Sequence, residues 1–181
     1  VYVRANWVSA SSAMYSRTVM RTGRPYATST GRGRVSNQTL EQLQEHNFGS
    51  WWNPADQPHH GGEDILTLAE LLEMALAAPQ HIELAIETKH PTRYGGYTEQ
   101  VLVQTLERFG LADGHNGKAR VMSFSAIALR RMRDLAPRIP TVYLMDKVPM
   151  LQRFGPLPFG AGVAGPSIEI LQSDPSQVAR W

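Results

Sequence analysis

The sequence contains no cysteine among its 181 residues, which excludes disulfide bonds, thiolate metal sites and a cysteine nucleophile. No apolar run approaches the roughly 20 residues that a helix needs to cross a bilayer. No basic flank followed by an apolar core stands at the start, so no signal peptide is visible. Because the chain begins with Val1 rather than Met, its natural N-terminus and any targeting segment can be missing. We therefore expect a soluble protein, cytoplasmic or exported.

The chain also lacks a strong charge of either sign. Its formal net charge is +2, and the basic residues are scattered rather than arranged in a stripe, which argues against a nucleic-acid partner. One basic patch, residues 21–34, has no interleaved aromatic residue apart from Tyr26, so a disordered arm is the better interpretation. The hydrophobic and charged fractions, 42% and 19%, are typical of a globular domain with its own core.

From residue 39 onward, predicted helices and strands alternate. Two capping-box patterns, starting at Thr39 and Thr67, open helices. Further elements follow from apolar spacing, caps and proline or glycine stops: strands at 81–90, 119–123, 141–145 and about 162–164, and helices at 97–109, 126–136 and 175–181. Repeated strand–helix–strand units predict an α/β fold with a parallel sheet. No glycine-rich phosphate fingerprint follows any strand, which favours a barrel over an open dinucleotide-binding sheet.

The most informative stretch is residues 81–91, which alternates apolar and polar side chains as a half-buried strand does. Glu87 and Lys89 share one face at its C-terminal end, just before Pro91. In α/β proteins ligands bind at that end of the sheet. A carboxylate there can hold a divalent cation, and a lysine can meet a phosphate oxygen. A plain Glu–Lys pair without function is the alternative.

Four motifs, in order, resemble the glycerophosphodiester phosphodiesterase family. The first extends over residues 28–52 and is similar to the segment that follows the family's second catalytic histidine. The others are residues 65–72, similar to "P-T-L-x-E-x-L"; residues 86–91, similar to "I-E-x-K-x-P"; and residues 121–137, similar to "S-F-S…P". The resemblance covers roughly residues 28–178.

The resemblance implies a TIM (β/α)₈ barrel that hydrolyses a glycerophosphodiester to glycerol 3-phosphate and an alcohol, in lipid and glycerol phosphodiester metabolism. It implies that Glu87 binds a divalent cation, Mg²⁺ or Ca²⁺, and that Lys89 contacts the substrate phosphate. It leaves open the headgroup and the metal. Such a metal would neutralise charge on the phosphate oxygens.

The N-terminal segment departs from the family. The motifs "H-R-G", "E-x-D" and "H-D" have no counterpart in residues 1–27, so both catalytic histidines are missing and no catalytic residue is predicted. The family's last strand would lie beyond Trp181. We expect residues 1–27 to be an irregular segment that arose from a frameshift or a misjudged gene start, and residues 28–181 to form a truncated barrel of about five strands.

Alone, this chain is expected to be inactive and to self-associate through open barrel edges. A non-catalytic phosphate-binding remnant and a related barrel phospholipase are the alternatives.

Other candidates have plainer interpretations. Trp51 and Phe124 could line the substrate pocket, with core packing as the alternative. The adjacent His59 and His60 point apart and are read as part of a solvated turn rather than a metal site. His90 could reach the ligand, but the simpler interpretation is a surface histidine in a loop.

Overall fold

The computed structural model describes residues 3–6, 38–44, 66–92, 94–114, 118–148 and 156–181. The chain divides into two units. One combines residues 1–7 with residues 68–181, and the other consists of residues 8–67. The predictions for Trp51, His59 and His60 lie outside the described residues.

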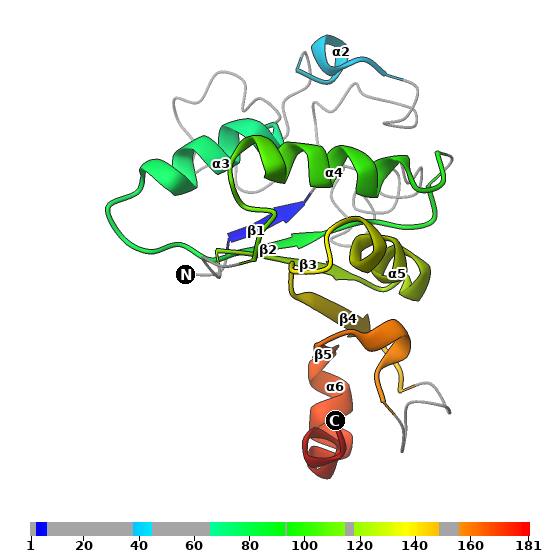
Figure 1. The fold of residues 1–181 in the computed structure, drawn as a ribbon. Helices are drawn as coiled ribbons and strands as arrows, with labels where there is room; N and C mark the ends of the chain where they lie inside the picture. Colours follow the sequence, from blue (N-terminus) through cyan, green and yellow to red (C-terminus); the bar gives the residue numbers. More distant parts are fainter. Residues whose placement is uncertain (1–2, 7–37, 45–65, 93, 115–117, 149–155) are drawn as a thin grey trace, which may run out of the picture. The chain divides into compact units, whose positions relative to one another are not determined.

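Five strands of the larger unit form one parallel sheet, in the order of the sequence (Figure 1). They are β1 (Val3–Asn6), β2 (Leu84–Glu87), β3 (Ala119–Ser123), β4 (Thr141–Met145) and β5 (Val163–Pro166). Each strand pairs with the next one along the chain. This order has no reversal, whereas the open dinucleotide-binding sheet reverses at its ligand crevice. The topology is that of one arc of a (β/α)₈ barrel, and four of its five strands, β2 to β5, overlap the strands predicted from the sequence.

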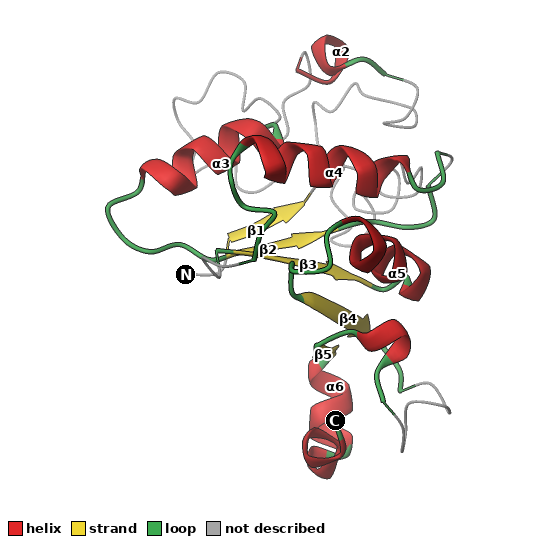
Figure 2. Ribbon diagram, in the orientation of Figure 1, coloured by secondary structure: helices red, strands yellow, loops and turns green. Residues whose placement is uncertain are grey.

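Helices connect the strands and cover one face of the sheet, as Figure 2 shows. The connections are α3 (Leu68–Ala77), α4 (Tyr97–Arg108), α5 (Ala126–Leu135) and the 3-10 turn η4 (Pro158–Gly160). After β5 follow α6 (Ile168–Ser173) and the 3-10 helix η5 (Pro175–Arg180). One apolar cluster joins α3, α4 and α5 to β2 and β3, and its members include Leu72, Leu84, Ile86, Leu102, Leu106, Val121 and Met132.

The expected caps explain where several helices begin and end. Ser125 accepts a hydrogen bond from the Ala128 N–H at 3.3 Å and starts α5, as predicted. Gly110, the predicted stop of α4, has a φ of +67° and donates its N–H to the Glu107 carbonyl at 3.0 Å. In the smaller unit, α2 (Leu40–Gln44) begins with the predicted capping box, because Thr39 and Gln42 each bond the other's backbone N–H.

The strand that carries Glu87 differs from the half-buried strand predicted. It is shorter, four residues, and all four side chains are buried. Leu84 and Ile86 pack under the helices, so Ala85 and Glu87 face the opposite side, which in a barrel is the interior. A strand of a parallel sheet is covered on both faces. In the sequence, Ala85 and Glu87 were interpreted as an exposed polar face, although both are buried.

Further elements also differ from the sequence predictions. Val3–Asn6 is a strand paired with β2, although residues 1–27 were expected to be irregular. The helix α6 was not predicted. The segment after Asp174 is a 3-10 helix, and the Asp174 side chain does not cap it. Instead its carboxylate binds the Ser176 hydroxyl and the Arg180 guanidinium, which hold its pKa below the usual range.

No helix in the described ranges is both long and apolar enough to cross a membrane.

Candidate active site

The candidate site lies at the C-terminal edge of the sheet, where β2 and β3 end. Glu87 is the last residue of β2 and its side chain is fully buried. Lys89 follows two residues later, and its Nζ lies 2.6 Å from Glu87 Oε1. The predicted pairing of carboxylate and ammonium is therefore present. A buried carboxylate needs such a partner, because removing an unpaired charge from water is costly.

Glu87 lies on the face of β2 opposite to Leu84 and Ile86, which pack under the helices, and Lys89 pairs with it there. The Lys89 side chain is 23% exposed, whereas that of Glu87 is 0% exposed. The Lys89 ammonium therefore contacts the buried carboxylate, while part of the Lys89 side chain is accessible to solvent. In a (β/α)₈ barrel the active site is built at this C-terminal end, and an ammonium in this setting can receive an anion from solvent.

Backbone contacts fix the chain on the N-terminal side of Lys89. The Thr88 N–H donates to the Met122 carbonyl at 2.9 Å, which extends the β2–β3 ladder by one bond. The Ser123 hydroxyl donates to the Thr88 carbonyl at 2.8 Å and accepts the Ser125 N–H at 3.1 Å. The buried Ser123 thus joins the chain after β2 to the start of α5.

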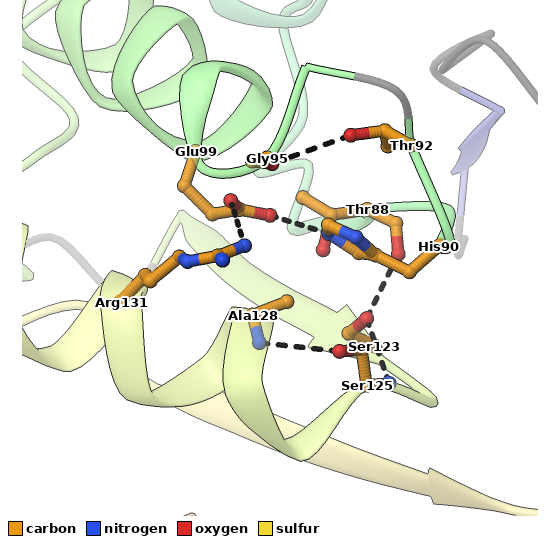
Figure 3. Close-up of polar contacts among 9 residues, drawn as sticks. All are labelled: Thr88, His90, Thr92, Gly95, Glu99, Ser123, Ser125, Ala128 and Arg131. Carbon is orange, nitrogen blue, oxygen red and sulfur yellow. Dashed lines mark hydrogen bonds and ion pairs between the residues drawn. The ribbon is translucent and has the colours of Figure 1, made fainter.

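On the C-terminal side of Lys89, His90 is not the surface loop residue that the sequence predicted. Its side chain is only 12% exposed, and its Nε2 lies 2.6 Å from Glu99 Oε1. Glu99 belongs to the first turn of α4 and is fully buried. Its second oxygen, Oε2, lies 3.5 Å from the Arg131 guanidinium of α5 (Figure 3). His90 is therefore part of a partly buried polar network around the buried Glu99, and the prediction of a surface histidine was wrong.

The sequence contained a signal for Glu99 that was missed. Glu99, Leu102, Val103 and Leu106 are all buried on α4, at the spacing of one helical face. A carboxylate on that apolar stripe needs a buried partner, and only a cation or a donor from another element can provide it. The spacing marked Glu99 as unusual, but no sequence pattern pointed to Arg131.

Phe124, the second predicted pocket residue, directly follows β3. It is 46% exposed, so core packing is not its role. Its position at the C-terminal edge is compatible with a pocket lining, and that role stays a prediction.

Among the described residues, Glu87 is the candidate metal ligand. Glu87 offers the oxygen donor that Mg²⁺ and Ca²⁺ prefer, and its place beside Lys89 suits a cation that lies next to a phosphate. Within the ranges that the structure covers, however, no three His, Asp or Glu residues gather as a metal cluster. Glu87 thus fits as one ligand of a set that these ranges do not complete.

Comparison with known proteins agrees with the fold and identifies the family. Residues 23–164 match the model of the glycerophosphoryl diester phosphodiesterase family. A Mycobacterium tuberculosis protein named "Probable glycerophosphodiester phosphodiesterase 1" is 40% identical over 159 residues, which are 84% of this chain and 57% of that protein. The glycerophosphodiester phosphodiesterase of Bacillus subtilis is 33% identical over 125 residues, 66% of this chain and 41% of that protein.

A solved structure shares the fold. The crystal structure of a glycerophosphodiester phosphodiesterase from Parabacteroides distasonis superposes with a TM-score of 0.56 and 19% identity, over 78% of this chain and 52% of that one. The chain thus spans about half the length of the relatives that it matches. With the family model matched over most of its length and the parallel arc of strands in place, the chain belongs to the glycerophosphoryl diester phosphodiesterase family.

Proposed function

We propose that the C-terminal edge of this sheet binds the phosphate of a glycerophosphodiester, with Lys89 as the phosphate contact and Glu87 as one ligand of a divalent cation. The observation that carries the proposal is the 2.6 Å ion pair between the partly exposed Lys89 ammonium and the buried Glu87 carboxylate. An anion on Lys89 would lie next to Glu87, and the two negative charges would repel each other. A bound Mg²⁺ or Ca²⁺ would neutralise charge on both.

The residues of this chain then act by binding and orientation. Lys89 supplies a compact positive charge for a phosphate oxygen. Thr88 and Ser123 hold the backbone beside it through the 2.8 Å bond from Ser123 Oγ. Hydrolysis would further require a general acid and a base or nucleophile. The complete protein is the proposed glycerophosphodiester hydrolase, and its histidines would come from motifs that residues 1–27 lack.

For the 181-residue chain alone we propose phosphate binding without hydrolysis. The described site offers His90, but its Nε2 is engaged by Glu99, and residues 1–27 contain no histidine at all. The specific prediction is that glycerophosphocholine mixed with this chain and Mg²⁺ or Ca²⁺ releases no glycerol 3-phosphate above the uncatalysed rate. If the highly purified chain still released glycerol 3-phosphate above the uncatalysed rate, this part of the proposal would be wrong.

Translation of the neighbouring nucleotide sequence in all three frames tests the origin of residues 1–27. A frame that encodes the "H-R-G" and "E-x-D" motifs would support the frameshift or gene-start hypothesis. If no frame encodes them, a non-catalytic, phosphate-binding member of the family becomes the better description.

Calorimetric titration with glycerol 3-phosphate, with and without Mg²⁺ or Ca²⁺, tests the site directly. Lys89→Met should weaken binding at least about tenfold, since a charge-assisted hydrogen bond is worth about 1.5–3 kcal/mol. Glu87→Gln should remove the effect of the cation. Lys118→Met is the matched control, because Lys118 immediately precedes β3, at the opposite end of the strands. Equal affinities for wild type and Lys89→Met would refute the proposal.

A further inference from the structure

The segment between β2 and α4 carries Lys89 between two anchored residues. Before it, Thr88 is held by the Met122 carbonyl and the Ser123 hydroxyl. After it, His90 is held by Glu99. Lys89 has a long and flexible side chain, and its ammonium can stay on Glu87 only if the backbone between these anchors keeps its course. The anchor at His90 is the only one of the two that depends on buried charge.

The side chains of His90 and Glu99 form a short hydrogen bond, 2.6 Å between Nε2 and Oε1. An ionised carboxylate only accepts hydrogen bonds, and against such a group His90 donates from Nε2. The Arg131 guanidinium, 3.5 Å from the other oxygen, gives Glu99 a compensating charge. Figure 3 shows Glu99 between the two side chains, so that one carboxylate joins the β2–α4 segment to α5.

The surroundings of Arg131 are shaped for this contact. A Cβ atom on Gly96 would lie 3.2 Å from both Cδ and Nε of Arg131, which is closer than most side-chain contacts allow. Gly96 has an ordinary negative φ of −84°, so the backbone itself does not require glycine here. The missing side chain leaves room for Arg131 to pass α4 and reach Glu99.

A buried charge of this kind adds little to stability compared with an apolar side chain of similar size. Glu99 is fully buried on the apolar face of α4, where a leucine could pack. A residue that is costly to bury and is bonded at both oxygens is suited to fixing a geometry rather than to filling a core.

We propose that Glu99 is a positioning residue, which bridges His90 and Arg131 and thereby holds the chain beyond β2 so that the Lys89 ammonium stays on Glu87. This inference rests on the proposed function, in which Lys89 is the residue that contacts the phosphate. Glu99 itself acts through His90 and touches no substrate.

The test reads the position of Lys89 without any ligand. Nitrogen-15 NMR measures how fast the ammonium protons of Lys89 exchange with water, and an ion pair with Glu87 slows this exchange. Glu99→Gln keeps one oxygen acceptor but removes the negative charge, which weakens the bonds to His90 and Arg131, and it should raise the rate about tenfold. Glu83→Gln is the matched control: Glu83 also pairs with an arginine, Arg120, but precedes β2 at the other end of the strand. It should leave the rate unchanged.

Conservative replacement of His90 separates positioning from general damage. His90→Gln keeps a side-chain donor for Glu99, and the exchange rate should stay within about twofold of wild type; His90→Leu removes the donor and should raise the rate about tenfold. If Glu99→Gln does not fold, Gly96→Ala takes its place, because a Cβ atom there crowds the Arg131 side chain and shifts it slightly while Glu99 keeps its bond to His90. It should raise the rate by a smaller factor.

Unchanged Lys89 exchange in the folded variants, or an equal rise in Glu83→Gln, would overturn the proposal. A separate titration with glycerol 3-phosphate distinguishes this failure from that of the proposed function. If Glu99→Gln speeds the exchange but leaves the affinity unaltered, Glu99 positions Lys89 and the assignment of Lys89 to the phosphate is wrong.

Discussion

At the scale of single residues, the candidate site depends on how one buried carboxylate is compensated. Glu87 has no exposed surface, and Lys89 contacts it from a partly exposed position. A carboxylate that loses its cation inside a protein costs more than the pair itself contributes, because the remaining charge stays desolvated. The pair is thus both a requirement of the fold and the proposed ligand contact.

This predicts a stability effect for Lys89 that is independent of any ligand. Lys89→Met should lower the free energy of unfolding by about 2 kcal/mol, measured by urea denaturation at neutral pH. Lys147→Met serves as the comparison, since Lys147 is an exposed residue just beyond β4, and its effect should stay within about 0.5 kcal/mol. Equal losses in the two variants would contradict the role assigned to Lys89.

The sequence could reveal part of this site and not the rest. The pairing of Glu87 with Lys89 could be predicted because an alternating strand places residues two apart on one face. His90 was misplaced because nothing local shows that a loop histidine folds back onto the next helix. Arg131 lies 32 residues from Glu99, and contacts over that distance follow from tertiary packing alone.

At the scale of elements, helix starts were well predicted where a side chain satisfies the first free N–H groups. Ser125 shows this for α5. The helix α6 was missed although Ser167 caps it, with Oγ 3.4 Å from the Ile170 N–H, because a six-residue helix is too short to display a period. The strand β1 was missed because only its pairing with β2 makes it a strand.

The caps provide a direct test. Ser125→Ala should cost about 1 kcal/mol of the free energy of unfolding. Ser167→Ala should cost about half as much, since its hydrogen bond is longer and α6 is shorter. Urea unfolding of both variants measures this, and a larger loss for Ser167→Ala would contradict the ranking.

A glycine pair tests the close approach between the loop that follows α4 and the loop that joins α5 to β4. Gly114 has a φ of +69°, and a Cβ there would lie 2.0 Å from the Arg138 carbonyl oxygen. Gly95 has a φ of +56° but nothing within 4 Å. Gly95→Ala should therefore cost only the backbone strain, about 1 kcal/mol, whereas Gly114→Ala should cost at least about 3 kcal/mol. Thermal and urea unfolding would show equal losses if the close approach were absent.

At the scale of the whole molecule, the sequential parallel sheet is what makes the C-terminal edge a single surface. All five strands run in one direction, so their carboxyl ends, with the segments after β2 and β3, meet there. The barrel class was predictable from repeated strand–helix units. Whether the strands close into a complete barrel could not be predicted. The described strands form only an arc of one.

Within the part of the chain that the structure covers, β1 and β5 each pair with a single neighbour. Exposed strand edges promote pairing between chains, so the sedimentation coefficient of the purified chain should rise with concentration. Val163→Lys, which places a charge on β5 at a residue 41% exposed, should suppress this rise. Val178→Lys in η5, at a residue 62% exposed, is the control and should not. A wild-type chain that stays monomeric at all concentrations would contradict the edge mechanism.

In the proposed function, the Lys89 ammonium at the end of β2 receives the phosphate. The chain has only three lysines, Lys89, Lys118 and Lys147, so their side-chain nitrogen resonances can each be assigned by one substitution. Titration with glycerol 3-phosphate should shift the Lys89 resonance in a saturable way and leave that of Lys118 in place. A Lys89 resonance that does not move while the phosphate binds elsewhere would contradict the claim.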